Sequence, residues 1–119
     1  MPFEIISLPQ GDSFARGYSS LQDEFGVVAI NLAAWNFVFT LKANQSDLDA
    51  AALLSIVTAQ MTTNNATGQV GFTVTPAQLS ALTLGAGYSY AFKAKSPGGF
   101  VSTLDEGLLT LAASARKTF

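Results

Sequence analysis

The stretch Asn36-Phe37-Val38-Phe39-Thr40-Leu41-Lys42 decides the fold class of this chain. In an extended backbone successive side chains point to opposite faces, so Phe37, Phe39 and Leu41 share one face. The polar residues of the stretch lie on the opposite face, around Val38. This alternation predicts a strand with one buried and one exposed face.

The same alternation recurs further along the chain, in Val70, Phe72 and Val74 and again in Tyr88, Tyr90 and Phe92. Residues that favour turns separate these runs, as in Gln22–Gly26, Asn64–Gly68 and Ser96–Gly99. We also expect a strand over Phe14–Leu21, joined by a hairpin at Gln22–Gly26 to a second strand. Turn signals repeated roughly every 8 to 12 residues are typical of sandwiches and barrels. We therefore expect an all-β chain of about seven strands, in two antiparallel sheets packed face to face rather than in a closed barrel.

Two segments depart from the strand pattern and predict short helical turns. Ser46 can cap a short helix that runs to Leu54, and the β-branched residues that follow predict a strand over Val57–Thr62. In Thr75–Leu82, a threonine cap precedes a proline at the first helical position. We expect this second turn to bridge the two sheets.

The length of 119 residues suits one domain over residues 1–119, and the weak periodicity of residues 112–119 predicts an extended C-terminal tail. Hydrophobic residues make up 49% of the chain and charged residues only 12%, against about a quarter in ordinary soluble domains. A surface with so few charges favours burial against neighbouring proteins. The alternative is a monomer that Ser, Thr, Asn and Gln keep in solution.

The charge balance and the absent residue types exclude several function classes. Six basic and eight acidic side chains give a net charge of -2, so no basic field meets a nucleic acid backbone. The chain has no cysteine, and therefore no disulfide framework, thiolate nucleophile or zinc-finger spacing. The N-terminus and the rest of the chain predict neither a signal peptide nor a membrane span.

Catalysis has few candidate groups, because the chain lacks histidine as well as cysteine. Three acidic pairs remain: Asp23/Glu24, Asp47/Asp49 and Asp105/Glu106. Paired carboxylates can hydrolyse glycosides or bind calcium, but a carboxylate beside a turn more commonly caps or bends the chain. We place all three pairs beside turns, and expect no enzyme and no catalytic, cofactor-binding or metal-binding residue.

Aromatic side chains provide the other candidate site. Trp35 precedes the strongest strand and is expected in the core. Together with Tyr88 and Tyr90, it could instead form a stacking platform for a carbohydrate or a host receptor. That alternative requires the three rings to lie exposed in one cluster.

The order of turns and strands resembles a known family over most of the chain. The segments that carry the resemblance are Gly11-Asp12-Ser13, Leu21 to Gly26, Asn36 to Lys42, Ser46 to Ala51, Gly68 to Pro76, Gly87 to Tyr90 and Gly99 to Gly107. The chain resembles the immunoglobulin-like phage structural module found as the N-terminal domain of siphophage upper baseplate proteins. The resemblance implies an immunoglobulin-like antiparallel β-sandwich with no catalytic residues.

The resemblance also implies a role in a bacteriophage particle. Because the module stands alone here, it suits a capsid decoration or cement protein that acts through protein–protein contacts with major capsid or tail proteins. It would form a homo-oligomer in the virion, after assembly in the bacterial cytoplasm, with no nucleic acid, membrane or cofactor as a partner. The alternatives are a tail, baseplate or neck component, or a receptor- or carbohydrate-binding module.

Overall fold

The computed structural model describes residues 3–9, 11–29, 31–44, 52–64, 68–79, 82–83, 85 and 87–112. Its elements are β1 (Phe3–Pro9), β2 (Phe14–Tyr18), β3 (Asn36–Lys42), β4 (Leu54–Val57), η2 (Thr58–Gln60, a 3-10 helix), β5 (Thr62–Asn64), β6 (Gln69–Val74), α1 (Pro76–Leu79), β7 (Gly87–Lys95) and β8 (Val101–Ala112). The described residues thus form eight strands, one more than the approximate number expected.

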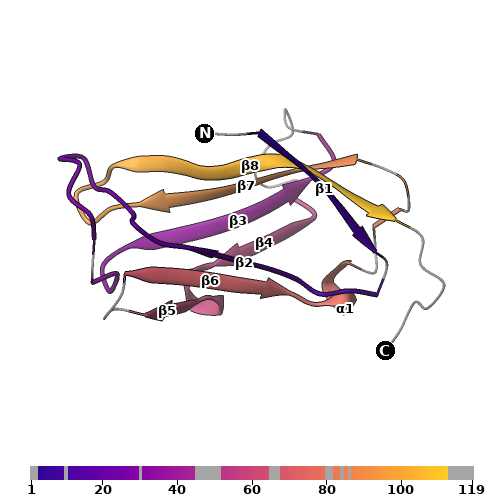
Figure 1. Cartoon of the computed structure of the whole chain (residues 1–119), viewed down its shortest axis with the longest axis horizontal. Coiled ribbons are helices and arrows are strands. Elements are labelled where there is room, and N and C mark those ends of the chain that lie inside the picture. Colours follow the sequence, from indigo (N-terminus) through magenta and orange to yellow (C-terminus); the bar gives the residue numbers. More distant parts are fainter. Residues whose placement is uncertain are drawn as a thin grey trace.

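Strand β3 lies inside a five-stranded sheet and has the same bounds as the stretch that predicted it. The strand order in this sheet is β1-β8-β7-β3-β4 (Figure 1). Phe39 pairs with Phe92 of β7 on one side and with Ile56 of β4 on the other. The alternating residues of neighbouring strands are therefore in register, and one face of the sheet becomes a continuous apolar surface.

The second sheet has three strands in the order β2-β6-β5. Its central strand, β6, supplies Val70, Phe72 and Val74, all of which are buried, as their alternation predicts. The inward faces of the two sheets pack against each other, and 19 buried apolar residues of the described ranges form one core cluster.

The topology is that of an immunoglobulin-like β-sandwich, which confirms the predicted fold class. The orders β8-β7-β3-β4 and β2-β6-β5 match the G-F-C-C′ and B-E-D strand orders of immunoglobulin domains. Of the six strand pairs, one departs from the antiparallel arrangement: β1 runs parallel to β8, from Phe3 opposite Glu106 to Pro9 opposite Ala112. Nearly the whole described chain separates these two strands in sequence, so no hairpin constrains their relative direction.

Stacked aromatic rings join the two sheets at the centre of the core. The ring of Phe92, which is 0% exposed, lies 4.3 Å from that of Tyr18 in β2, 5.6 Å from that of Phe72 and 5.9 Å from that of Phe37. In antibody domains a disulfide joins strands B and F, which correspond to β2 and β7. In this chain, which has no cysteine, the contact between Tyr18 and Phe92 connects the same two strands.

The segment from Leu54 to Asn64 corrects one prediction. A single strand over Val57–Thr62 was expected, but β4 ends at Val57, η2 follows, and β5 begins at Thr62 in the other sheet. The Thr58 hydroxyl accepts the Phe37 N–H at 2.7 Å and donates to the Phe37 carbonyl at 3.2 Å. This hydroxyl takes the place of a backbone partner at the end of β4, so the chain can leave the first sheet and cross to the second.

The predicted helical turns have different outcomes. Helix α1 begins at Pro76, and a capping box holds its start: the Gln78 N–H donates to the Thr75 hydroxyl (3.3 Å), and the Thr75 N–H donates to the Gln78 side chain (2.9 Å). As predicted, α1 leads from β6 in one sheet to β7 in the other. Residues 46–51 of the other predicted helix lie outside the described residues, and Leu54 already belongs to β4.

Two predicted boundaries also shift. The tail was expected to start at residue 112, but Ala112 ends β8 and pairs with Pro9, while residues 113–119 lie outside the described residues. The strand expected over Phe14–Leu21 ends at Tyr18, because Ser20 has a positive φ of 57° that extended backbone does not accommodate.

Candidate interaction surface

The three aromatic residues considered as a stacking platform are all buried. The exposed fraction is 5% for Trp35, 8% for Tyr88 and 3% for Tyr90. Trp35 packs parallel to Phe37 at a ring distance of 6.1 Å, which confirms its place in the core. The exposed cluster that a carbohydrate- or receptor-binding site would need is not formed by these rings, so that alternative loses its main support.

The acidic pair Asp105/Glu106 does not lie beside a turn, which corrects the prediction. Asp105 is in the middle of β8, opposite Phe92, and is only 7% exposed. A β-bulge changes the register here: Phe92 pairs with Asp105, whereas the next residue, Lys93, pairs with Thr103. Asp105 is in phase with the inward-facing Leu109, and this alternation was the sequence signal for its burial.

Two tyrosine hydroxyls satisfy the buried carboxylate. Tyr18 donates to Asp105 Oδ2 at 2.7 Å and Tyr90 donates to Oδ1 at 3.3 Å. Burial, together with the hydrogen bond and the charge of Asp105, raises the pKa of the Tyr18 phenol far above its ordinary range. The phenol therefore remains a proton donor at neutral pH, and the bond ties β2 of one sheet to β8 of the other.

The polar cluster does not bring the two members of the acidic pair together. Alternation along the strand directs Glu106 to the opposite face of β8 from Asp105, so the two carboxylates do not converge. Each Asp105 oxygen accepts from a phenol. We interpret the cluster as a cross-sheet link.

Asp23 and Glu24 lie in a loop, as predicted, and each stabilises it. The Oδ1 atom of Asp23 accepts the N–H groups of Phe25 (2.9 Å) and Val27 (3.0 Å). Glu24 accepts the hydroxyl of Ser96 at 2.7 Å. Asp47 and Asp49, the remaining pair, lie outside the described residues.

The loop around Asp23 differs from the hairpin that was predicted. The N–H of Gly26 donates to the Asp23 carbonyl, and Gly26 has a φ of +74° that favours glycine. After this turn, the expected second strand is reduced to one isolated bridge between Gln22 and Val28.

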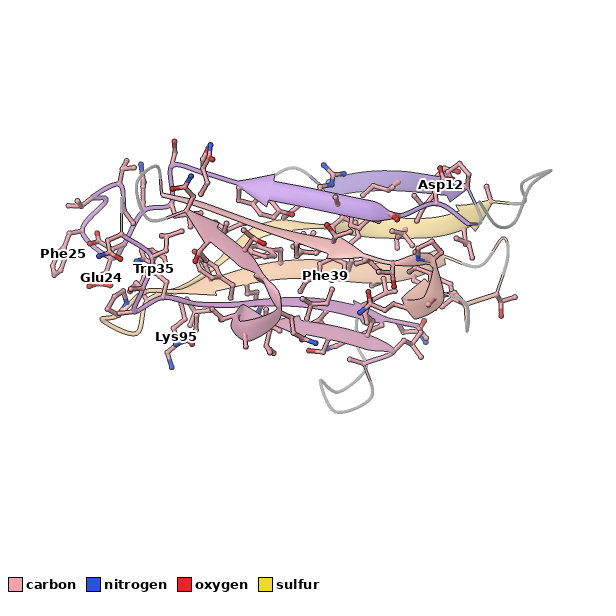
Figure 2. All side chains as sticks on the ribbon, turned by 90° about the horizontal axis from the view of Figure 1, so that it is seen from below. Asp12, Glu24, Phe25, Trp35, Phe39 and Lys95 are labelled. Atoms are coloured by element: carbon pink, nitrogen blue, oxygen red, sulfur yellow. The ribbon has the colours of Figure 1, made fainter. Side chains whose placement is uncertain are left out.

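We define the tip as loop 22–28 together with turn 96–101, which leads out of β7 and includes the first residue of β8, Val101. The bond between Glu24 and Ser96 connects these two segments. Figure 1 shows both at the same end of the sandwich, and Figure 2 places Phe25 and Glu24 at that end and Asp12 at the opposite end. The tip therefore lies at one end of the molecule's 46 Å long axis.

Large apolar side chains remain exposed in two regions. At the tip they are Phe25 (81%), Val27 (59%), Val28 (49%), Phe100 (43%) and Val101 (54%). At the edges of the five-stranded sheet they are Ile5 on β1 (73%), Val57 on β4 (46%) and Leu53 just before β4 (51%). Sequence reasoning did not identify these residues individually; the signal was the presence of apolar residues at turn positions that usually carry polar ones.

The outer face of the five-stranded sheet has a hollow of about 330 Å³. The residues that line it include the small residues Ser89 and Ala91 and the charged residues Lys42, Lys93 and Glu106. With a single carboxylate, the hollow lacks the pair that glycoside hydrolysis requires.

Within the described ranges, no three His, Cys, Asp or Glu side chains gather as a metal site would require. The same part of the chain contains no helix with the length and apolar character needed to cross a membrane.

No family model and no curated protein matches this sequence. Among solved structures, the chain is similar to Drosophila OTK, extracellular domains 3-5, with 10% sequence identity and a TM-score of 0.42. The match covers 95% of this chain and 33% of the Drosophila chain, so this chain spans about a third of that structure's length. A similarity at this level says nothing about function.

Proposed function

We propose that this chain is a non-enzymatic structural protein of a bacteriophage particle, in which it binds neighbouring virion proteins as a capsid decoration or cement protein. The assignment to a phage follows from the resemblance of its strand and turn order to the phage immunoglobulin-like module. The proposal that it acts through protein contacts follows from the surface described above.

The observation that carries the proposal is the distribution of apolar side chains. The core accommodates most of the large ones, yet eight remain exposed among the described residues, at the tip and at the sheet edges. Charged residues, which normally keep such a surface in water, make up only 12% of the chain. Exposed apolar groups that gather in patches are typical of surfaces that bind other proteins.

The sheet edges support a role in assembly. Strands β1 and β4 are the outermost strands of the five-stranded sheet, so each has one side without a partner strand in that sheet. Ile5 on β1 and Val57 on β4 are exposed beside these free edges. An open edge with apolar side chains can pair with a strand of another chain, which would suit a homo-oligomer on the particle surface.

The proposal is tested by reconstitution on particles. Particles of the phage that encodes the chain would be assembled with its gene deleted and then mixed with the purified protein. We expect saturable binding with a fixed number of copies per particle, visible on the capsid shell in a cryo-electron microscopy reconstruction. A protein that stays monomeric and does not bind these particles would refute the assignment, and density at the tail or neck would replace the capsid role by a connector role.

A further inference from the structure

The tip has the composition of a binding element rather than of an ordinary solvent-facing loop. Phe25 is 81% exposed, the highest value among the exposed large apolar residues of the described chain. Val27 and Val28 are exposed in the same loop, and Phe100 and Val101 in the adjoining turn. Phenylalanine is among the residues enriched at protein interfaces, where an aromatic ring can fill a partner's pocket.

Hydrogen bonds within the chain also hold the tip in one conformation in the absence of a partner. Asp23 fixes the loop through two backbone N–H groups, and Glu24 fixes it to Ser96 of the turn. The turn is closed by the Phe100 N–H, which donates to the Ser96 hydroxyl at 3.1 Å. At Gly98, an added Cβ would collide with the Glu24 carboxylate, so the two segments are closely packed. A surface ordered in advance loses less conformational entropy on binding.

The charges of the tip select among its conceivable partners. Loop 22–28 contains Asp23 and Glu24 and no basic residue, and turn 96–101 contains no charged residue. The nearby Lys95 side chain points away from Phe25 (Figure 2). An anionic lipid surface would repel these carboxylates, and a second copy of the tip would bring like charges together. A partner with basic groups around an apolar centre is complementary to the acidic and apolar side chains of the tip.

The position and shape of the tip also constrain the shape of its partner. The tip is at one end of the long axis of a molecule that measures 46 × 32 × 24 Å, and Phe25 projects from that end (Figure 2). A projecting end buries the most area in a concave site, whereas two projecting ends facing each other bury little.

We propose that the tip inserts Phe25 and the surrounding valines into an apolar socket with a basic rim on a neighbouring virion protein. This inference rests on the proposed function, and it names the surface and the chemistry of the partner. The edge strands remain available for contacts between copies of the chain.

The test compares substitutions at the tip with matched substitutions elsewhere. Phe25→Ser removes the ring, and Thr73→Ser removes an exposed methyl group from β6, the central strand of the three-stranded sheet, opposite Ala15 and away from both the tip and the sheet edges. We expect Phe25→Ser to raise the Kd for particles lacking the chain by at least about 30-fold, as for a central interface residue, and Thr73→Ser to leave it within about threefold. The urea midpoint of both variants should match that of the wild type, because both side chains are exposed.

A second comparison tests the basic rim. Glu24→Gln removes the charge but keeps an oxygen that can accept the Ser96 hydroxyl, and Glu106→Gln removes a charge from the outer face of β8. We expect Glu24→Gln, but not Glu106→Gln, to weaken binding and to flatten its salt dependence. If the binding of both variants to particles has the same salt dependence, the proposal of a basic rim on the partner is wrong.

The remaining outcomes separate this inference from the proposed function. If the wild type binds particles and Phe25→Ser binds equally well, the proposal that Phe25 enters a socket on the partner is wrong, but the proposed role as a virion protein is not contradicted. If the wild type does not bind particles, the virion role fails and the partner named here fails with it. Phe25-dependent binding to phosphatidylcholine or phosphatidylglycerol vesicles, or Phe25-dependent self-association in sedimentation, would replace the socket by a lipid surface or a second copy.

Discussion

Tyr18→Phe is the most informative single perturbation of this fold. It removes one hydroxyl and preserves the ring that stacks on Phe92 at 4.3 Å. The lost hydroxyl donates to Asp105, which is 7% exposed and keeps the Tyr90 hydroxyl, at 3.3 Å, as its other hydrogen bond to a phenol. The substitution therefore isolates the polar link between the sheets from the apolar packing around it.

The expected cost follows from the charge and the burial of the acceptor. A hydrogen bond to a charged group contributes about 1.5–3 kcal/mol, more than a neutral one, and a buried acceptor left short of donors adds a penalty. We expect the free energy of unfolding to fall by about 2 kcal/mol. With a urea m-value of about 2 kcal/mol/M, the midpoint should fall by roughly 1 M at an unchanged slope.

The assay is equilibrium unfolding in urea, followed by the fluorescence of the chain's single tryptophan, Trp35, which is buried in the core. Tyr88→Phe is the matched control, since the Tyr88 hydroxyl accepts a backbone N–H from Thr83 at 2.7 Å and does not contact a carboxylate in the structure. We expect it to cost about 1 kcal/mol, as for a neutral hydrogen bond.

A double-mutant cycle completes the test. Tyr18→Phe combined with Asp105→Ala should show a coupling free energy of about 1 kcal/mol or more, because the two side chains are in contact. Tyr88 pairs with Leu109, four residues along β8 from Asp105, so its cycle with Asp105→Ala should give less than about 0.5 kcal/mol. Similar midpoints for Tyr18→Phe and Tyr88→Phe, with no coupling in either cycle, would refute the cross-sheet link.

Three further predictions use other parts of the structure. Phe92→Ala should destabilise the fold by about 3–5 kcal/mol in the same urea assay, because it opens a cavity at a side chain that is 0% exposed; a cost below about 1.5 kcal/mol would mean that the core collapses around the site. Asp23→Ala should increase amide hydrogen exchange at Phe25 and Val27, whereas Asp23→Asn should largely preserve their protection because an acceptor oxygen remains; equal exchange in the two variants would contradict the loop geometry. The raised pKa of Tyr18 predicts that stability falls above about pH 10, because the unfolded phenol loses its proton there while the folded one keeps it; Tyr18→Phe should flatten that decline, and an unchanged slope from pH 9 to 11 would count against the buried phenol.

Alternation made the strands of the core predictable. Phe39, Phe72 and Phe92 each lie in a run in which every second residue is apolar, and all three are buried. The capping box between Thr75 and Gln78 was predictable for a related reason, since its hydrogen bonds join residues three positions apart. In both cases the physical cause acts within a few residues, so a single sequence contains it.

The sheet to which each strand belongs was harder to predict. The residues of Val57–Thr62 favour an extended chain, and β4 and β5 are extended, but they belong to different sheets. The break between them depends on the Thr58 hydroxyl meeting the backbone of Phe37, 21 residues away. The parallel pairing of β1 with β8 likewise joins the two ends of the described chain.

The candidate surface likewise combines features that the local sequence predicts with features that depend on residues distant in sequence. The low charge content indicated that some apolar surface would remain exposed, but not where it would gather. Phe25 and Phe100 share one end of the molecule because Glu24 reaches Ser96, 72 residues along the chain. Asp105 was predicted to serve a turn, and it instead accepts a hydroxyl from Tyr18, 87 residues away, in the opposite sheet.

The sequence by itself determined that this chain forms half-buried strands, which side chains face the core, and that histidine and cysteine chemistry is absent. Only the tertiary structure decided which strands pair, which acid is buried and which apolar residues form the tip. The reason is that alternation and capping are governed by the local backbone, whereas pairing and burial depend on contacts between residues that are distant in sequence.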